Sequence, residues 1–127
     1  MTTVAALAFA GLTAGVVAFQ LALALGAPWG AYAMGGRSPG RFPPAMRVAA
    51  VGQAVLLTVI AVVVLSDANL VLPSLAQTFP WLIWAVVAFS AVSVVLNTLT
   101  PSARERRIWA PVALVMLACS LIVALSP

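Results

Sequence analysis

The sequence predicts an all-α integral membrane four-helix bundle, built from two transmembrane helical hairpins. Of its 127 residues, 65% are apolar and only 6% are charged, and the mean hydropathy is +1.20. A soluble domain carries about 25% charged residues, because its surface faces water. Six basic and two acidic side chains are too few for such a surface, so we expect lipid to be the main solvent. We therefore interpret residues 1–127 as a single transmembrane domain.

Four apolar runs supply the predicted helices. Each is about 20 residues long, which is enough to cross about 30 Å of hydrocarbon as a helix. The first run lacks the basic segment of a signal peptide and exceeds the usual length of its apolar core, so we interpret it as a retained helix. The predicted helices cover residues 4–26, 45–65, 81–99 and 102–125.

Breaker residues separate the runs. Residues 27–44 are rich in Gly and Pro and contain Trp29 and Tyr32, a composition typical of a loop at the level of the lipid headgroups. The segment 70–80 contains two prolines and predicts a short re-entrant or interfacial connector.

Two details of the last helix stay open. It begins either at Thr100-Pro101, as an N-cap followed by a first-turn proline, or at the capping box Ser102-x-x-Glu105. Pro111 then either kinks the helix or marks the start of its membrane-spanning part.

Charge predicts the topology. The first and third connections, together with the helix ends beside them, hold all the basic residues, whereas the second holds none and carries Asp67. Basic loops stay in the cytoplasm, which predicts a multi-pass protein of the bacterial inner (plasma) membrane with both termini outside. Nucleic-acid binding is not expected, because a basic footprint requires a solvated face. The basic residues are Arg37, Arg41, Arg47, Arg104, Arg106 and Arg107.

Several kinds of chemistry are excluded by what the sequence lacks. Histidine is absent and Cys119 is the only cysteine, which excludes an intrachain disulfide and any zinc or haem site built on His or several Cys ligands. No apolar run, the fourth of which is residues 108–125, carries an internal Asp, Glu, Lys or His, the groups that proton-coupled transporters use near the midplane. We expect no metal, no cofactor and no catalytic residue.

Three amides are the strongest polar groups inside the runs. Gln20, Gln53 and Asn97 come from three helices at comparable depth, near the basic end. One interpretation is an interhelical hydrogen-bond cluster, worth about 0.6 kcal/mol per bond in membranes. The other is a shallow cytoplasmic pocket lined by the amides. Three further residues would form its mouth: Trp29, Tyr32 and Arg104.

Two other patterns also have two interpretations. Gly11-x-x-x-Gly15 lets helix backbones approach closely, either inside the bundle or against a second copy. The arginines either bind the phosphates of lipid headgroups or only set the topology.

Several short segments carry a resemblance. With Gly26-Ala-Pro-Trp-Gly30, Gly35-Gly36, Asn97 and Ser102-Ala-Arg-Glu-Arg106, the chain resembles a set of small bacterial four-helix integral membrane proteins. The resemblance implies the four-helix architecture and no particular activity.

We therefore expect a non-enzymatic membrane protein that binds a lipid or partner helices, as an oligomer or an accessory subunit. The alternative is a transporter or channel for a small uncharged or anionic solute. A membrane-embedded enzyme ranks third.

Overall fold

The computed structural model describes residues 1–126, which form five α-helices and two short 3₁₀ helices and contain no strand. Four of the α-helices are long and apolar enough to cross a membrane, which confirms the predicted fold class. Pro127, the last residue of the predicted domain, lies outside the described residues. The elements are α1 (Thr2–Ala24), η1 (Gly30–Tyr32), η2 (Met34–Gly36), α2 (Pro44–Asp67), α3 (Pro73–Thr78), α4 (Leu82–Leu99) and α5 (Ala103–Leu125).

α1 ends two residues before the predicted position, because a glycine closes it. Gly26 adopts a φ of +101°, a conformation that favours glycine. Its N–H donates to the carbonyl of Leu23 at 3.1 Å. The N–H of Ala27 donates to the carbonyl of Ala22 at 2.9 Å, which completes a Schellman motif.

α2 is longer than predicted at both ends. Pro44 occupies its first turn, where a missing N–H costs no hydrogen bond. At the other end Asn69, with a φ of +62°, closes α2 in the same way that Gly26 closes α1. Asn69 and Leu70 donate their N–H groups back to the last turn of α2, at 2.9 Å each.

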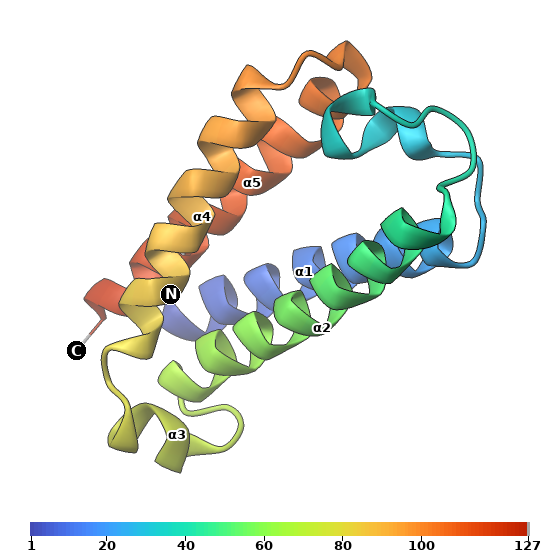
Figure 1. The fold of residues 1–127 in the computed structure, drawn as a ribbon. Coiled ribbons are helices and arrows are strands. Elements are labelled where there is room, and N and C mark those ends of the chain that lie inside the picture. Colours follow the sequence, from blue (N-terminus) through green and yellow to red (C-terminus); the bar gives the residue numbers. More distant parts are fainter. Residues whose placement is uncertain (127) are drawn as a thin grey trace.

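The connector after α2 contains the six-residue helix α3. Its start is fixed by Ser66, whose hydroxyl donates to the carbonyl of Leu72 at 2.7 Å and accepts from the N–H of Ala76 at 3.0 Å. α3 lies across the end of the bundle and does not enter between the long helices (Figure 1). Of the two predicted forms of this connector, re-entrant and interfacial, α3 has the position expected of the interfacial one.

The start of α5 is the predicted capping box rather than Thr100-Pro101. The hydroxyl of Ser102 accepts from the N–H of Glu105 at 3.2 Å. α5 then continues through Pro111 without a break, so the spanning helix does not begin at this proline.

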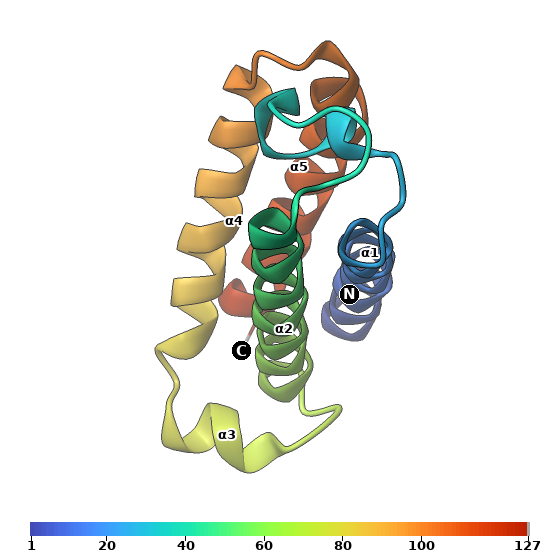
Figure 2. The same cartoon turned by 45° about the vertical axis from the view of Figure 1, so that its right-hand side comes forward.

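The four long helices form two antiparallel hairpins, α1/α2 and α4/α5, joined mainly where α1 packs on α5. Thr2 donates a 2.5 Å hydrogen bond to the hydroxyl of Ser126, so the start of α1 lies beside the end of α5. The hairpins pack closely at this end and diverge toward the opposite end, which carries the loop between α1 and α2 (Figures 1 and 2). The core at the closed end consists of Ala5, Ala6, Phe9, Ile60, Val63, Val64, Ile83, Val86, Met116, Cys119 and Val123.

Most of the surface of these helices is not covered by protein. Within an apolar stretch of 18 residues in each long helix, only 17–33% is buried. Large apolar side chains such as Val55, Val59 and Val95 point outward, with more than half of their surface exposed. Such surfaces are stable in lipid and not in water.

Candidate functional site

The loop between α1 and α2 folds over the divergent end of the bundle. Phe42 and Ala33 are buried against Leu23 of α1 and Ala50 of α2. The N–H of Gly30 donates to the carbonyl of Gly40 at 2.8 Å, which closes the loop on itself. A Cβ atom at Gly30 would overlap the carbonyl of Ser38, so only glycine fits there.

Hydrogen bonds attach this loop to the start of α5 in the other hairpin. Ser102 donates its hydroxyl to the carbonyl of Ala31 at 2.7 Å. Trp109 donates its indole N–H to the carbonyl of Tyr32 at 2.8 Å. The loop therefore bridges the two hairpins at the end where the helices themselves diverge.

The third link in this bridge is Glu105, whose side chain is only 9% exposed. Its Oε2 accepts from the N–H of Gly35 at 2.8 Å and from the hydroxyl of Thr100 at 3.1 Å. A carboxylate in the first turn of a helix also interacts favourably with the helix dipole. Glu105 thus bonds to the loop and to Thr100.

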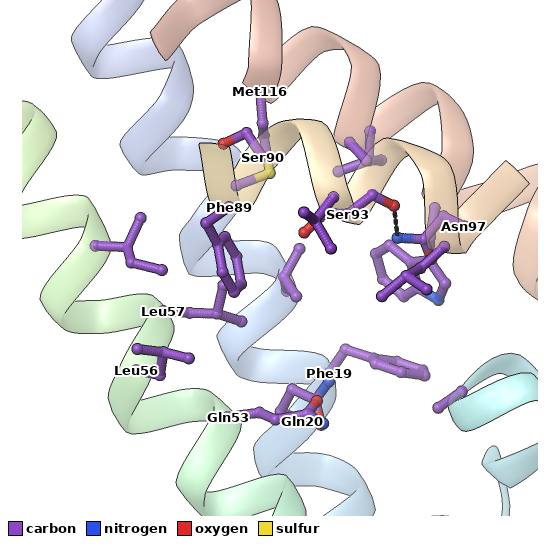
Figure 3. A pocket seen from close by; sticks show the side chains of 18 of the residues that line it. Phe19, Gln20, Gln53, Leu56, Leu57, Phe89, Ser90, Ser93, Asn97 and Met116 are labelled. Carbon is purple, nitrogen blue, oxygen red and sulfur yellow. Dashed lines mark hydrogen bonds between the residues drawn. The ribbon is translucent and has the colours of Figure 1, made fainter. Parts of the chain in front are cut away.

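Between the hairpins lies a cavity of about 430 Å³ (Figure 3). All four long helices and the loop contribute to it, and most of its wall is apolar, with Phe9, Phe19, Leu57, Phe89 and Met116. The polar members of the lining are Gln20, Tyr32, Gln53, Ser90, Ser93, Asn97 and Glu105, together with the indole of Trp109.

The cavity opens sideways, between α2 and α4. The lining residues at this edge are exposed and apolar: Leu56 is 48% exposed, Val92 56% and Leu96 64%. The opposite wall is closed, since Phe9 and Ala113 are buried. In a membrane, an opening between two spanning helices faces the lipid.

The three predicted amides all line this cavity, yet no hydrogen bond among the described residues joins them. Gln20 lies in α1 and is nine-tenths buried, and its Oε1 has no hydrogen-bond partner within residues 1–126. Gln53 is exposed on α2. Asn97 stands across the cavity on α4 and donates to the carbonyl of Ser93 at 2.7 Å, within its own helix (Figure 3).

The predicted mouth residues lie in different places. Tyr32 lines the cavity, and the guanidinium of Arg104 lies 5.9 Å from the centre of its ring. Trp29 is not part of the lining. It stacks on the lining residue Phe19, with 6.2 Å between ring centres and an interplanar angle of 6°.

The six arginines surround the loop end, and none lines the cavity. Arg47 is half-buried and donates to the carbonyl of Phe42 at 2.9 Å. Arg106 donates to the carbonyl of Thr100 at 3.0 Å. Arg106 is exposed, as are Arg37, Arg41, Arg104 and Arg107.

Gly11 and Gly15 lie on the outward face of α1. A Cβ atom at either position would meet nothing within 4 Å. Close packing inside the four-helix unit is therefore not what these glycines provide, and their face is open to lipid or to another chain.

Sequence reasoning missed the serines of the cavity. Ser90 and Ser93 precede Asn97 by seven and four residues, the spacing that puts three side chains on one helix face. That periodic polar stripe in an otherwise apolar helix was the available signal. The hydroxyl of Thr13, which is 1% exposed and has no partner among the described residues, had no comparable signal.

Fold and cavity together define a polytopic helical membrane protein with a laterally open intramembrane cavity. Among residues 1–126, no group of three or more His, Cys, Asp or Glu side chains could hold a metal ion. Comparison with protein-family models, with curated proteins and with solved structures finds no match.

Proposed function

We propose that this protein is a non-enzymatic membrane protein that binds a membrane lipid in the cavity between its two hairpins. The observation that carries the proposal is a cavity of about 430 Å³ that opens between α2 and α4 and is lined by Gln20, whose buried amide oxygen is unpartnered in the described chain. Ligand sites in proteins are typically apolar clefts of about 300–1,000 Å³ with a few well-placed polar groups.

A lipid is favoured over a water-soluble solute by the direction of the opening. Its rim consists of the exposed apolar side chains of Leu56, Val92 and Leu96. At the loop end, Glu105 and Tyr32 belong to the bridge that covers the cavity. A ligand that enters from the bilayer keeps its acyl chains in an apolar environment, whereas a polar solute would have to cross the apolar rim.

Binding is favoured over catalysis by the chemistry of the lining. Glu105 is the only carboxyl group that residues 1–126 contribute to it, and none of its other members is a lysine, histidine or cysteine. General acid–base catalysis of hydrolysis or transfer commonly uses two positioned titratable groups, or one with a metal ion. Amides, hydroxyls and aromatic rings can orient a ligand, and that role suits a binding protein or an accessory subunit.

The orientation in the membrane follows from the arginines. Both basic segments belong to the loop end, where Ser102 bonds to Ala31, while the Thr2–Ser126 hydrogen bond puts both ends of the chain opposite. The positive-inside rule supports a cytoplasmic loop end, with both termini outside, in a bacterial inner membrane.

The proposal is tested by filling the cavity. Ser93→Trp introduces a large side chain into the lining, and Val95→Trp adds the same side chain to the same helix at an outward position. Native mass spectrometry of the detergent-purified proteins should find a bound lipid in the wild type and in Val95→Trp, and a loss of it in Ser93→Trp. Equal lipid content in the two folded variants would refute binding in the cavity.

A further inference from the structure

We infer that the lipid bound in this cavity has an uncharged polar group with a hydrogen-bond donor, in the form of a free hydroxyl. The inference rests on the proposed function and specifies its ligand. The hydroxyl would belong to the glycerol of a diacylglycerol or to a long-chain alcohol, and the experiment below distinguishes these two sources.

The charges around the cavity disfavour a phosphate inside it. None of the six arginines is part of the lining. Arg104 approaches the lining residue Tyr32 from outside the cavity, with its guanidinium 5.9 Å from the centre of the ring. The single charged group that reaches the lining from the described residues is the carboxylate of Glu105. A phosphate there would have a like charge nearby and no cation, which is strongly unfavourable in a low-dielectric site.

The side-chain atom of the lining that is buried without a partner among the described residues is an acceptor. The Oε1 of Gln20 is buried, and no donor within residues 1–126 reaches it. Glu105 receives both of its hydrogen bonds on Oε2, so its Oε1 accepts none from the described residues. One of the two amide N–H groups of Asn97 is already used by its own helix. A ligand that donates a hydrogen bond complements the buried oxygen of Gln20.

Selectivity follows from the same groups. A buried acceptor that stays unpaired in a complex costs free energy, so an otherwise identical ligand without the donor should bind more weakly. For one hydrogen bond to a buried amide oxygen, we expect a difference of about tenfold in affinity.

The test uses four lipids, of which two differ from 1,2-dioleoylglycerol only at position 3 of the glycerol and one is a single-chain alcohol. These are 1,2-dioleoylglycerol, its 3-acetyl ester, which lacks the hydroxyl, dioleoylphosphatidic acid, which carries a phosphate in its place, and oleyl alcohol. Wild-type protein in phosphatidylcholine nanodiscs is titrated with each, and the bound lipid per protein is measured by native mass spectrometry. We expect dioleoylglycerol or oleyl alcohol to bind about tenfold better than the acetyl ester and the phosphatidic acid. The better of the two identifies the source of the hydroxyl.

Gln20→Leu should remove the preference for the hydroxyl and leave the binding of the acetyl ester unchanged. Gln20→Met serves the same purpose if the leucine variant is unstable. Thr98→Val is the matched control, because Thr98 is exposed and bonds only to the carbonyl of Val94. Equal binding of dioleoylglycerol and its acetyl ester to the wild type, or preferential binding of phosphatidic acid, would overturn the inference and leave the lipid-binding function standing. Failure of all four lipids to bind would also overturn the inference, and the comparison of Ser93→Trp with Val95→Trp decides separately whether the proposed function stands.

Discussion

The backbone N–H of Gly35 donates a 2.8 Å hydrogen bond to the carboxylate of Glu105, a residue seventy positions further along the chain. Gly35 belongs to the loop of the first hairpin, and Glu105 lies in the first turn of α5, the last helix of the second. Because the hairpins diverge at this end, the bond and its neighbours replace the helix packing that is missing there. They keep the loop over the cavity, so the stability of the cavity depends on them.

Glu105→Gln should therefore destabilise the protein. The amide provides one acceptor oxygen without charge, and hydrogen bonds to a charged group contribute about 1.5–3 kcal/mol. We expect a loss of about 2 kcal/mol in the free energy of unfolding in detergent, measured by circular dichroism. Arg107→Gln, at an exposed position, is the control and should stay within about 0.5 kcal/mol of the wild type. Equal stability of the two variants would mean that the link to Gly35 does not hold the loop.

Thr13→Val should stabilise the protein. The hydroxyl of Thr13 is buried without a partner among the described residues, and valine replaces it with a methyl group of similar size. Removing an unsatisfied buried polar group should raise the free energy of unfolding by about 1 kcal/mol. Thermal unfolding of the two proteins in the same detergent checks this. A lower unfolding temperature for Thr13→Val would show that the hydroxyl has a partner in the membrane.

Gly15→Ile should separate an oligomer without unfolding the protomer. A Cβ atom at this position would have no neighbour within 4 Å, so the larger side chain is accommodated within one copy. If the face with Gly11 and Gly15 contacts a second copy, isoleucine prevents the close approach of the backbones. We expect a smaller species by light scattering, with an unchanged unfolding temperature. An unchanged mass would remove this face from any subunit contact.

Two single-cysteine variants test the orientation, in a background in which Cys119 is replaced by alanine. Ser74→Cys lies on α3 at the end with the termini, and Ala103→Cys lies at the loop end, and both positions are exposed. A membrane-impermeant maleimide should label Ser74→Cys in intact cells, and label Ala103→Cys only after the cells are permeabilised. The opposite pattern would reverse the predicted topology.

The sequence was sufficient for the fold because the constraint is simple. A chain with four apolar runs of spanning length and almost no charge has few other ways to satisfy its backbone in lipid. The start of α5 could also be predicted from the sequence, since Ser102 and Glu105 form a common capping pattern. The ends of α1 and α2 were shifted by two residues, because they depend on the conformations of Gly26 and Asn69.

The site was only partly predictable. The amides of Gln20, Gln53 and Asn97 stand out in apolar helices, and their similar depth follows from helix length alone. Whether they bond to one another depends on the separation of the hairpins, which no local pattern encodes. The position of the Trp29 side chain could not be predicted either, because a composition typical of a headgroup-level loop does not specify which aromatic ring turns inward.

Photo-crosslinking tests lipid binding in the cavity most directly. Cells that express the protein are fed a fatty acid with a mid-chain diazirine, irradiated, and the lipid adducts are located by mass spectrometry of the digested protein. We predict adducts concentrated on the cavity rim, at Leu56, Val92 and Leu96, that are lost in Ser93→Trp and retained in Val95→Trp. Adducts spread evenly over the lipid-facing surface, the outward face of α1 at Gly11 included, and equal in both variants would contradict a lipid-binding cavity.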